Sequence, residues 1–146
     1  MTITSKNHNP QSTPRVATGS FKDTQTTPLK AIINLGWKPR YFKLWDVSAT
    51  EVVFEVTDGM AAATAFKTIE NGTLELIVGA MPQFIENYAT AAADLWAVYE
   101  TAVFGTGAAA KTDNSRLNLA AEQFTGVSIP AALVAQNIQL HWLAIG

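Results

Sequence analysis

The 146-residue chain has no cysteine, few charged residues and no long apolar run. The absence of cysteine excludes disulfide bonds and thiolate metal sites. Because no run of about 18 apolar residues occurs, no membrane-spanning helix is expected, and residues 1–6 lack the apolar core of a secretory signal. Charged residues make up 15% of the chain and hydrophobic residues 48%, which predicts one globular domain with a largely neutral surface.

The charges that are present are unevenly distributed along the chain. Residues 1–45 carry seven basic residues against one acid, and residues 46–146 carry three against eleven, so their formal charges are +6 and −8. One interpretation is chance segregation of solvated charges, and the other is that a basic segment docks on an acidic neighbour, such as another copy of the chain. The basic residues are spaced singly without a dense cluster, so nucleic-acid binding is not expected.

Residues 1–29 are rich in Asn, Thr, Ser, Gln and Pro. A segment of this composition cannot form a core of its own, and we expect an extended N-terminal arm that lies on other protein. The residues predicted to contact that partner are Lys6, Arg15, Val16, Phe21, Lys22, Leu29 and Lys30.

Residues 30–146 are expected to form a mainly β domain, an antiparallel β-sandwich or jelly roll. The stretch 34–45 predicts the end of one strand, a tight corner at Gly36 and Pro39, and a second strand. Apolar residues alternate with other residues in several segments, which predicts strands with one buried face. These segments are 41–47, 51–57 and 137–145, and short strands are also expected at 30–35 and 126–129.

The pair Asn71-Gly72 predicts a type I′ hairpin turn between strands at 66–69 and 73–78. In this hairpin Leu74, Leu76 and Val78 are expected to face the core.

Residues 79–120 are interpreted as an insertion in the β domain. Within it, residues 82–104 are rich in alanine and carry apolar residues at helical spacing, which predicts a helix. A strand over 96–104 is the alternative.

No residue pattern predicts catalysis, a metal site or a cofactor, so the chain is not expected to be an enzyme. The two histidines, His8 and His141, lack further ligands at fixed spacing. The segment 105–112 has Ala110 where a phosphate-binding loop needs glycine before its lysine. Aromatic residues have two interpretations, as core or subunit-interface residues or as an exposed platform for sugar rings. Those considered for an interface or platform are Trp37, Tyr41 and Trp45, with Trp142 as a further member.

The stretch Asn34-Leu35-Gly36-Trp37-Lys38-Pro39-Arg40-Tyr41 resembles a pattern in small tailed-bacteriophage virion proteins, Gly-aromatic-x-Pro-Arg/Lys-Tyr between two hydrophobic strands. The ending His141-Trp142-Leu143-Ala144-Ile145-Gly146 is similar to the closing strand of the same proteins. The resemblance covers about residues 30–78 and 124–146, and residues 79–120 depart from it. It implies a β-sandwich that is a structural component of a phage particle, without catalytic residues.

From this resemblance we expect a capsid decoration (cement) protein, made in the host cytoplasm and located on the capsid surface of the virion. Its expected partners are the major capsid protein and copies of itself, with a trimer as one arrangement, and neither nucleic acid nor membrane. The alternative is a tail fibre, spike or baseplate module that binds host glycan or receptor.

Overall fold

The computed structural model describes residues 15–22, 30–46, 52–89, 95–100, 116–118, 123–134 and 138–146, with the backbone alone described for 95–100 and 116–118. Within these ranges the chain is almost entirely β, and its one helical segment is a 3₁₀ turn at Ala131–Leu133. The described part holds no helix long and apolar enough to cross a bilayer. The strands are β1 (Val16–Lys22), β2 (Lys30–Asn34), β3 (Tyr41–Asp46), β4 (Val53–Thr57), β5 (Thr64–Thr68), β6 (Leu74–Val78), β7 (Gln83–Ala89), β8 (Leu95–Glu100), β9 (Arg116–Asn118), β10 (Gln123–Ile129) and β11 (Gln139–Ile145).

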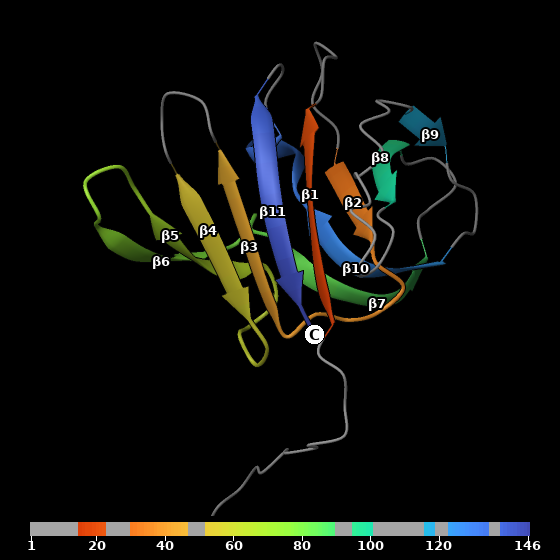
Figure 1. Cartoon of the computed structure of the whole chain (residues 1–146), viewed down its shortest axis with the longest axis horizontal. Coiled ribbons are helices and arrows are strands. Elements are labelled where there is room, and N and C mark those ends of the chain that lie inside the picture. Colours follow the sequence, from red (N-terminus) through yellow and green to blue (C-terminus); the bar gives the residue numbers. More distant parts are fainter. Residues whose placement is uncertain are drawn as a thin grey trace, which may run out of the picture.

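The strands form two sheets (Figure 1). The larger sheet has six strands in the order β1-β11-β3-β4-β5-β6, all antiparallel to their neighbours. The smaller sheet has five strands in the order β7-β10-β2-β8-β9, in which only β2 and β8 are parallel. The prediction of a mainly β chain is confirmed.

One hydrophobic core draws on both sheets. Period-2 alternation places Phe42, Leu44 and Trp142 of the larger sheet in this core, and each has essentially no exposed surface. Ile33 of β2 and Val127 of β10 join them from the smaller sheet. The burial of apolar surface stabilises a folded protein by about 25 cal/mol per Å². It is the main source of the stability of this domain.

The predicted corner is confirmed, and it carries the chain from the smaller sheet to the larger one. Gly36 has a φ of +78°, a conformation that glycine adopts without steric cost. The N–H groups of Leu35 and Gly36 both donate to the Thr125 carbonyl, at 2.9 and 3.0 Å. Pro39 is fully buried, so the corner is fixed by packing as well as by its turn residues.

The hairpin at Asn71-Gly72 is confirmed in position, but the predicted turn type is wrong. Gly72 donates to the Ile69 carbonyl at 2.8 Å, and Ile69 donates to the Thr73 carbonyl at 3.2 Å, which makes a three-residue loop with Gly72 (φ +82°) as a bulge. Asn71 does not have the positive φ that a type I′ turn requires.

The predicted orientation of β6 is also wrong. Leu74, Leu76 and Val78 are 60%, 56% and 76% exposed, whereas Ile77 packs against the core from the opposite side of the strand. Ile77 lies opposite Ala65, which is fully buried, so this pair fixes which face of the hairpin is inward. Alternation then points the other three apolar side chains toward solvent.

The predicted arm is in part a strand of the domain. Val16–Lys22 forms β1, which pairs with β11 along its whole length, from Val16 opposite Ile145 to Lys22 opposite Gln139. Phe21 has no exposed surface and belongs to the shared core. Residues 1–14 and 23–29 of the arm lie outside the described residues.

The helix predicted over 82–104 is wrong wherever the structure describes this segment. Gln83–Ala89 is β7, paired with β10, and Leu95–Glu100 is β8, paired with β2, so the alternative of a strand is confirmed for 96–100. At Asn87 (φ +49°) the β7–β10 register shifts by one residue, and the Asn87 N–H donates to the Thr125 hydroxyl at 3.1 Å. This bulge changes which face the side chains of β7 occupy.

Candidate functional site

The outer face of the larger sheet, opposite the core, gathers most of the exposed apolar side chains that the structure describes. Strand pairing aligns its residues in rows that cross the sheet. One row is Ser20, His141, Trp45, Val53, Thr68 and Leu74, and the next is Thr18, Leu143, Lys43, Glu55, Phe66 and Leu76. Large hydrophobic side chains that are at least 36% exposed are Val16, Phe66, Leu74, Leu76, Val78 and Ile145, and all of them lie on this sheet.

Trp45 lies on the outer face near the end of β3, in the row that also holds His141 and Val53. Its ring stacks on the His141 imidazole, with 5.8 Å between ring centroids and 22° between ring planes. The Lys43 ammonium lies 5.3 Å from the centroid of the Trp45 ring, within cation–π distance. Both contacts hold the half-buried indole in one orientation, so it presents a fixed aromatic surface.

Tyr41 lies on the same face of β3, two alternations from Trp45. Its hydroxyl donates to Glu55 Oε2 at 2.6 Å, a charge-assisted hydrogen bond. Burial and the hydrogen bond to the Glu55 carboxylate raise the pKa of Tyr41 to about 12. Glu55 therefore has a specific structural partner, which is sufficient to explain its presence on the sheet.

Trp37 does not belong to this surface, so of its two interpretations the core residue is confirmed and the exposed platform is wrong. It is only 6% exposed and lies in the shared core, close to the backbone of Gly146. Trp142 is fully buried and stacks on Phe42, with ring centroids 6.3 Å apart. Burial at these two positions follows from the corner and from the inward phase of β11, which a count of aromatic residues does not reveal.

The basic residues predicted on the arm do not form one patch. Arg15 and Lys22 are exposed but lie at opposite ends of β1, separated by about 23 Å at the usual rise of a strand. Val16 is 36% exposed, Phe21 is buried, and Lys30 is exposed at the start of β2. Lys6 and Leu29 lie outside the described residues.

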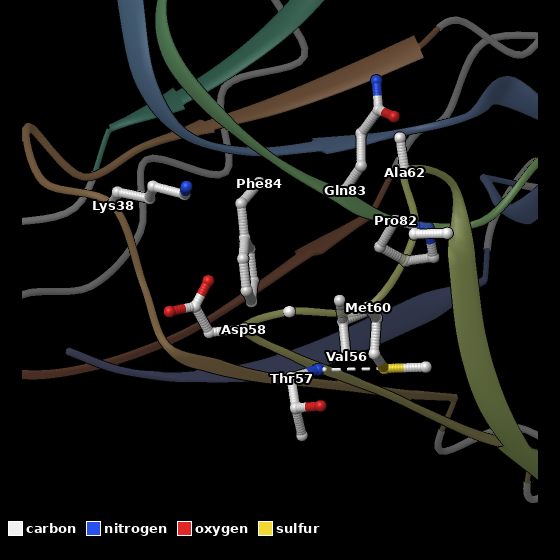
Figure 2. A pocket seen from close by; sticks show the side chains of 11 residues that line it. Lys38, Val56, Thr57, Asp58, Met60, Ala62, Pro82, Gln83 and Phe84 are labelled. Carbon is white, nitrogen blue, oxygen red and sulfur yellow. Dashed lines mark hydrogen bonds between the residues drawn. The ribbon is translucent and has the colours of Figure 1, made fainter. Parts of the chain in front are cut away.

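A small pocket lies between the β4–β5 connection and β7 (Figure 2). Its volume is about 160 Å³, and its charged lining residues are Lys38 and Asp58. The Thr57 N–H donates a hydrogen bond to Met60 Sδ, with 3.2 Å between the two atoms; Figure 2 shows this bond near the bottom of the view. A pocket of this size is smaller than the roughly 300–1,000 Å³ of small-molecule sites, and its lining contains no histidine, serine or cysteine nucleophile–base pair.

Within the described ranges, no three His, Asp or Glu side chains lie close enough together to hold a metal ion. The outer face of the larger sheet, which carries the exposed large hydrophobic side chains of the described residues, is suited to contact with another macromolecule. Comparisons with protein-family models, curated proteins and solved structures each found no match for this chain.

Proposed function

We propose that this chain is a virion structural protein that decorates a tailed-phage capsid and stabilises it by adhesion. The observation that carries this proposal is the outer face of the larger sheet, on which rigid aromatic and exposed aliphatic side chains extend from β1 to β6. Exposed apolar surface of this extent marks interaction sites on otherwise well-packed domains. The resemblance of residues 34–41 and 141–146 to phage virion proteins supplies the class of particle.

The two sheets with one shared core are consistent with a jelly-roll-like β-sandwich, which suits such a role. Its rigid face docks without loss of much conformational entropy, because β3, β4 and β11 are hydrogen-bonded on both sides. Each copy would add a modest interface energy, and many copies on one shell would together resist internal pressure.

Immunogold electron microscopy of virions from the source of this sequence tests the location. Gold at many positions on each head is the expected result, whereas particles without label contradict the proposal. In a second assay, the full-length chain is sedimented with heads that lack it. Trp45→Ala on the outer face should weaken binding about thirtyfold, about 2 kcal/mol, the effect of losing one aromatic hot spot. Glu86→Ala, at an exposed position of β7, is the matched control.

A second candidate function is glycan or receptor binding by a tail fibre or baseplate module. The stacked pair of Trp45 and His141, with Lys43 and Glu55 beside it, offers an aromatic surface next to hydrogen-bonding groups. Saturable quenching of tryptophan fluorescence by host polysaccharide, lost in Trp45→Ala, together with gold confined to the tail, would favour this candidate.

A further inference from the structure

β6 forms one edge of the larger sheet, and its open side carries backbone groups without partners among the described residues. Ile69 donates to the Thr73 carbonyl and Gly79 donates to the Ala63 carbonyl, so the residues of β6 whose backbone bonds reach β5 are Glu75 and Ile77. Because hydrogen-bonding direction alternates along an antiparallel strand, the N–H and C=O groups of Leu74, Leu76 and Val78 point away from β5. Among the large hydrophobic side chains in the described part of the chain, those of the same three residues are the most exposed.

The other sheet edges in the described part of the chain carry features that discourage pairing. β1 carries a lysine, Lys22, on its open side, β7 is interrupted by the bulge at Asn87, and β9 has only three residues. β6 has no lysine, proline or bulge. Figure 1 shows the β5–β6 hairpin at the left end of the molecule, at the far end of the larger sheet from β1.

We propose that β6 pairs antiparallel with β6 of a second copy, centred on Leu76, to join two larger sheets into one continuous sheet. In this register Leu76 lies opposite Leu76 of the second copy, and Leu74 lies opposite Val78. The residues brought together are those whose N–H and C=O groups point outward, so every pair exchanges both backbone hydrogen bonds. The contact is self-complementary and closes on a two-fold axis, whereas β6 pairing with β1 would build an open filament.

Charge selects this register over its neighbour. In the register centred on Leu76, Glu75 lies opposite Ile77 of the second copy, so no two like charges are opposite each other. In the neighbouring register, centred on Glu75, the two Glu75 carboxylates would lie directly opposite each other, which is destabilising. The self-complementary pattern of Leu74, Leu76 and Val78 around one central residue therefore favours a second copy of this chain over an unrelated strand.

The area predicts a weak dimer. Three side chains on β6 that are 56–76% exposed, Leu74, Leu76 and Val78, make a patch on the order of a few hundred Å² per copy. Stable interfaces bury about 800 Å² per partner, so we expect a dissociation constant on the order of micromolar or weaker. The proposal does not depend on the proposed function, because it concerns the purified chain alone.

Cross-linking tests the register, since the chain has no cysteine and each variant carries a single thiol. Leu76→Cys places two thiols at the two-fold axis, about 5.5 Å apart between Cα atoms. Val78→Cys is the control, because it is more exposed than Leu76 but its thiol lies four residues from its counterpart, about 13 Å away along the strands. A short bis-maleimide should cross-link Leu76→Cys at least tenfold faster, and equal rates would overturn the proposal.

Sedimentation of the full-length chain up to millimolar concentration tests the association itself. Leu76→Pro removes an N–H that points away from β5, so the fold should persist by circular dichroism while dimerisation is lost. Thr18→Pro makes the same change on the opposite edge, β1, and should leave dimerisation intact. A wild-type chain that stays monomeric, a Leu76→Pro variant that still dimerises, or loss of dimer in Thr18→Pro would each refute pairing through β6. Because these assays contain no particles, their failure is distinguishable from failure to label virions.

Discussion

Phe21→Ala tests whether the N-terminal segment is an appendage or part of the folded core. The Phe21 side chain has no exposed surface and packs in the core that both sheets share. A buried phenylalanine ring removes roughly 150–250 Å² from water, about 4–6 kcal/mol as an upper bound, and measured truncations cost about 3–5 kcal/mol. We expect the free energy of unfolding to fall by about 4 kcal/mol and the melting temperature by on the order of 10 °C.

Urea denaturation followed by tryptophan fluorescence measures this loss. Thr18→Ala is the matched control, because Thr18 lies on the same strand but is exposed, and its cost should stay within about 0.5 kcal/mol. A loss below about 1 kcal/mol for Phe21→Ala would refute the reasoning. It would mean that the core does not depend on Phe21, as the polar composition of residues 1–29 alone suggests.

Further predictions concern the backbone and the outer face. Gly126→Ala would place its Cβ 2.1 Å from the Ile33 carbonyl oxygen. The melting temperature should therefore fall by at least 5 °C, which corresponds to a loss of about 2 kcal/mol in the free energy of unfolding. Gly59→Ala, with no atom within 4 Å of the added Cβ, should lower the free energy of unfolding by less. In a tyrosinate absorbance titration, one tyrosine should deprotonate near pH 12, and Glu55→Gln should lower that pKa. Because the folded chain holds this proton more tightly than the unfolded chain, whose tyrosine pKa is about 10, the stabilisation is complete below pH 10 and is lost as the pH rises toward 12. A titration in which all tyrosines deprotonate together near pH 10 contradicts the Tyr41–Glu55 contact.

The sequence predicts the corner and the strands around it because their local chemistry and their burial agree. Gly36 and Pro39 favour a turn by their own conformational limits, and in β3 and β11 the alternating apolar residues are the buried ones. Where one face of a strand is apolar and the other is polar, periodicity identifies both the strand and its orientation. The hairpin position follows in the same way from Asn71-Gly72.

The strand β6 is predicted correctly but with the wrong orientation, and β7 is predicted as a helix, because neither strand has such a pattern. In β6 the larger apolar set, Leu74, Leu76 and Val78, faces solvent, since the inward side is fixed by Ile77 against its neighbour β5. In β7 the bulge at Asn87 breaks the alternation of a strand, so no period-2 pattern competes with the helical spacing of the apolar residues from Tyr88 onward. Tertiary pairing overrides local pattern in both strands.

The polar segment 16–22 was interpreted as an arm because composition reports average polarity, whereas a strand needs only alternate residues to be apolar or small. Ala17 and Phe21 supply the two buried positions of β1, and the exposed positions between them are free to be polar. On the outer face, Tyr41 and Trp45 are identified from the sequence as candidate interface or platform residues, but His141 is not. The contact between Trp45 and His141 joins strands 96 residues apart, and only the pairing of β3 with β11 brings them together.

Pairing through β6 and adhesion through the outer face are compatible, because the first contact is made at the edge of the sheet and the second on its face. Hydrogen bonds between two copies of β6 lie in the plane of the sheet, so Trp45, Phe66 and their neighbours remain available on its face. A pair would present two outer faces held side by side in one continuous sheet. If the outer face binds a repeating surface, the second contact becomes intramolecular, so a weak dimer in solution would strengthen attachment well beyond the affinity of one copy. Leu76→Pro should then weaken binding to heads as well as dimerisation, whereas Trp45→Ala should weaken binding to heads alone.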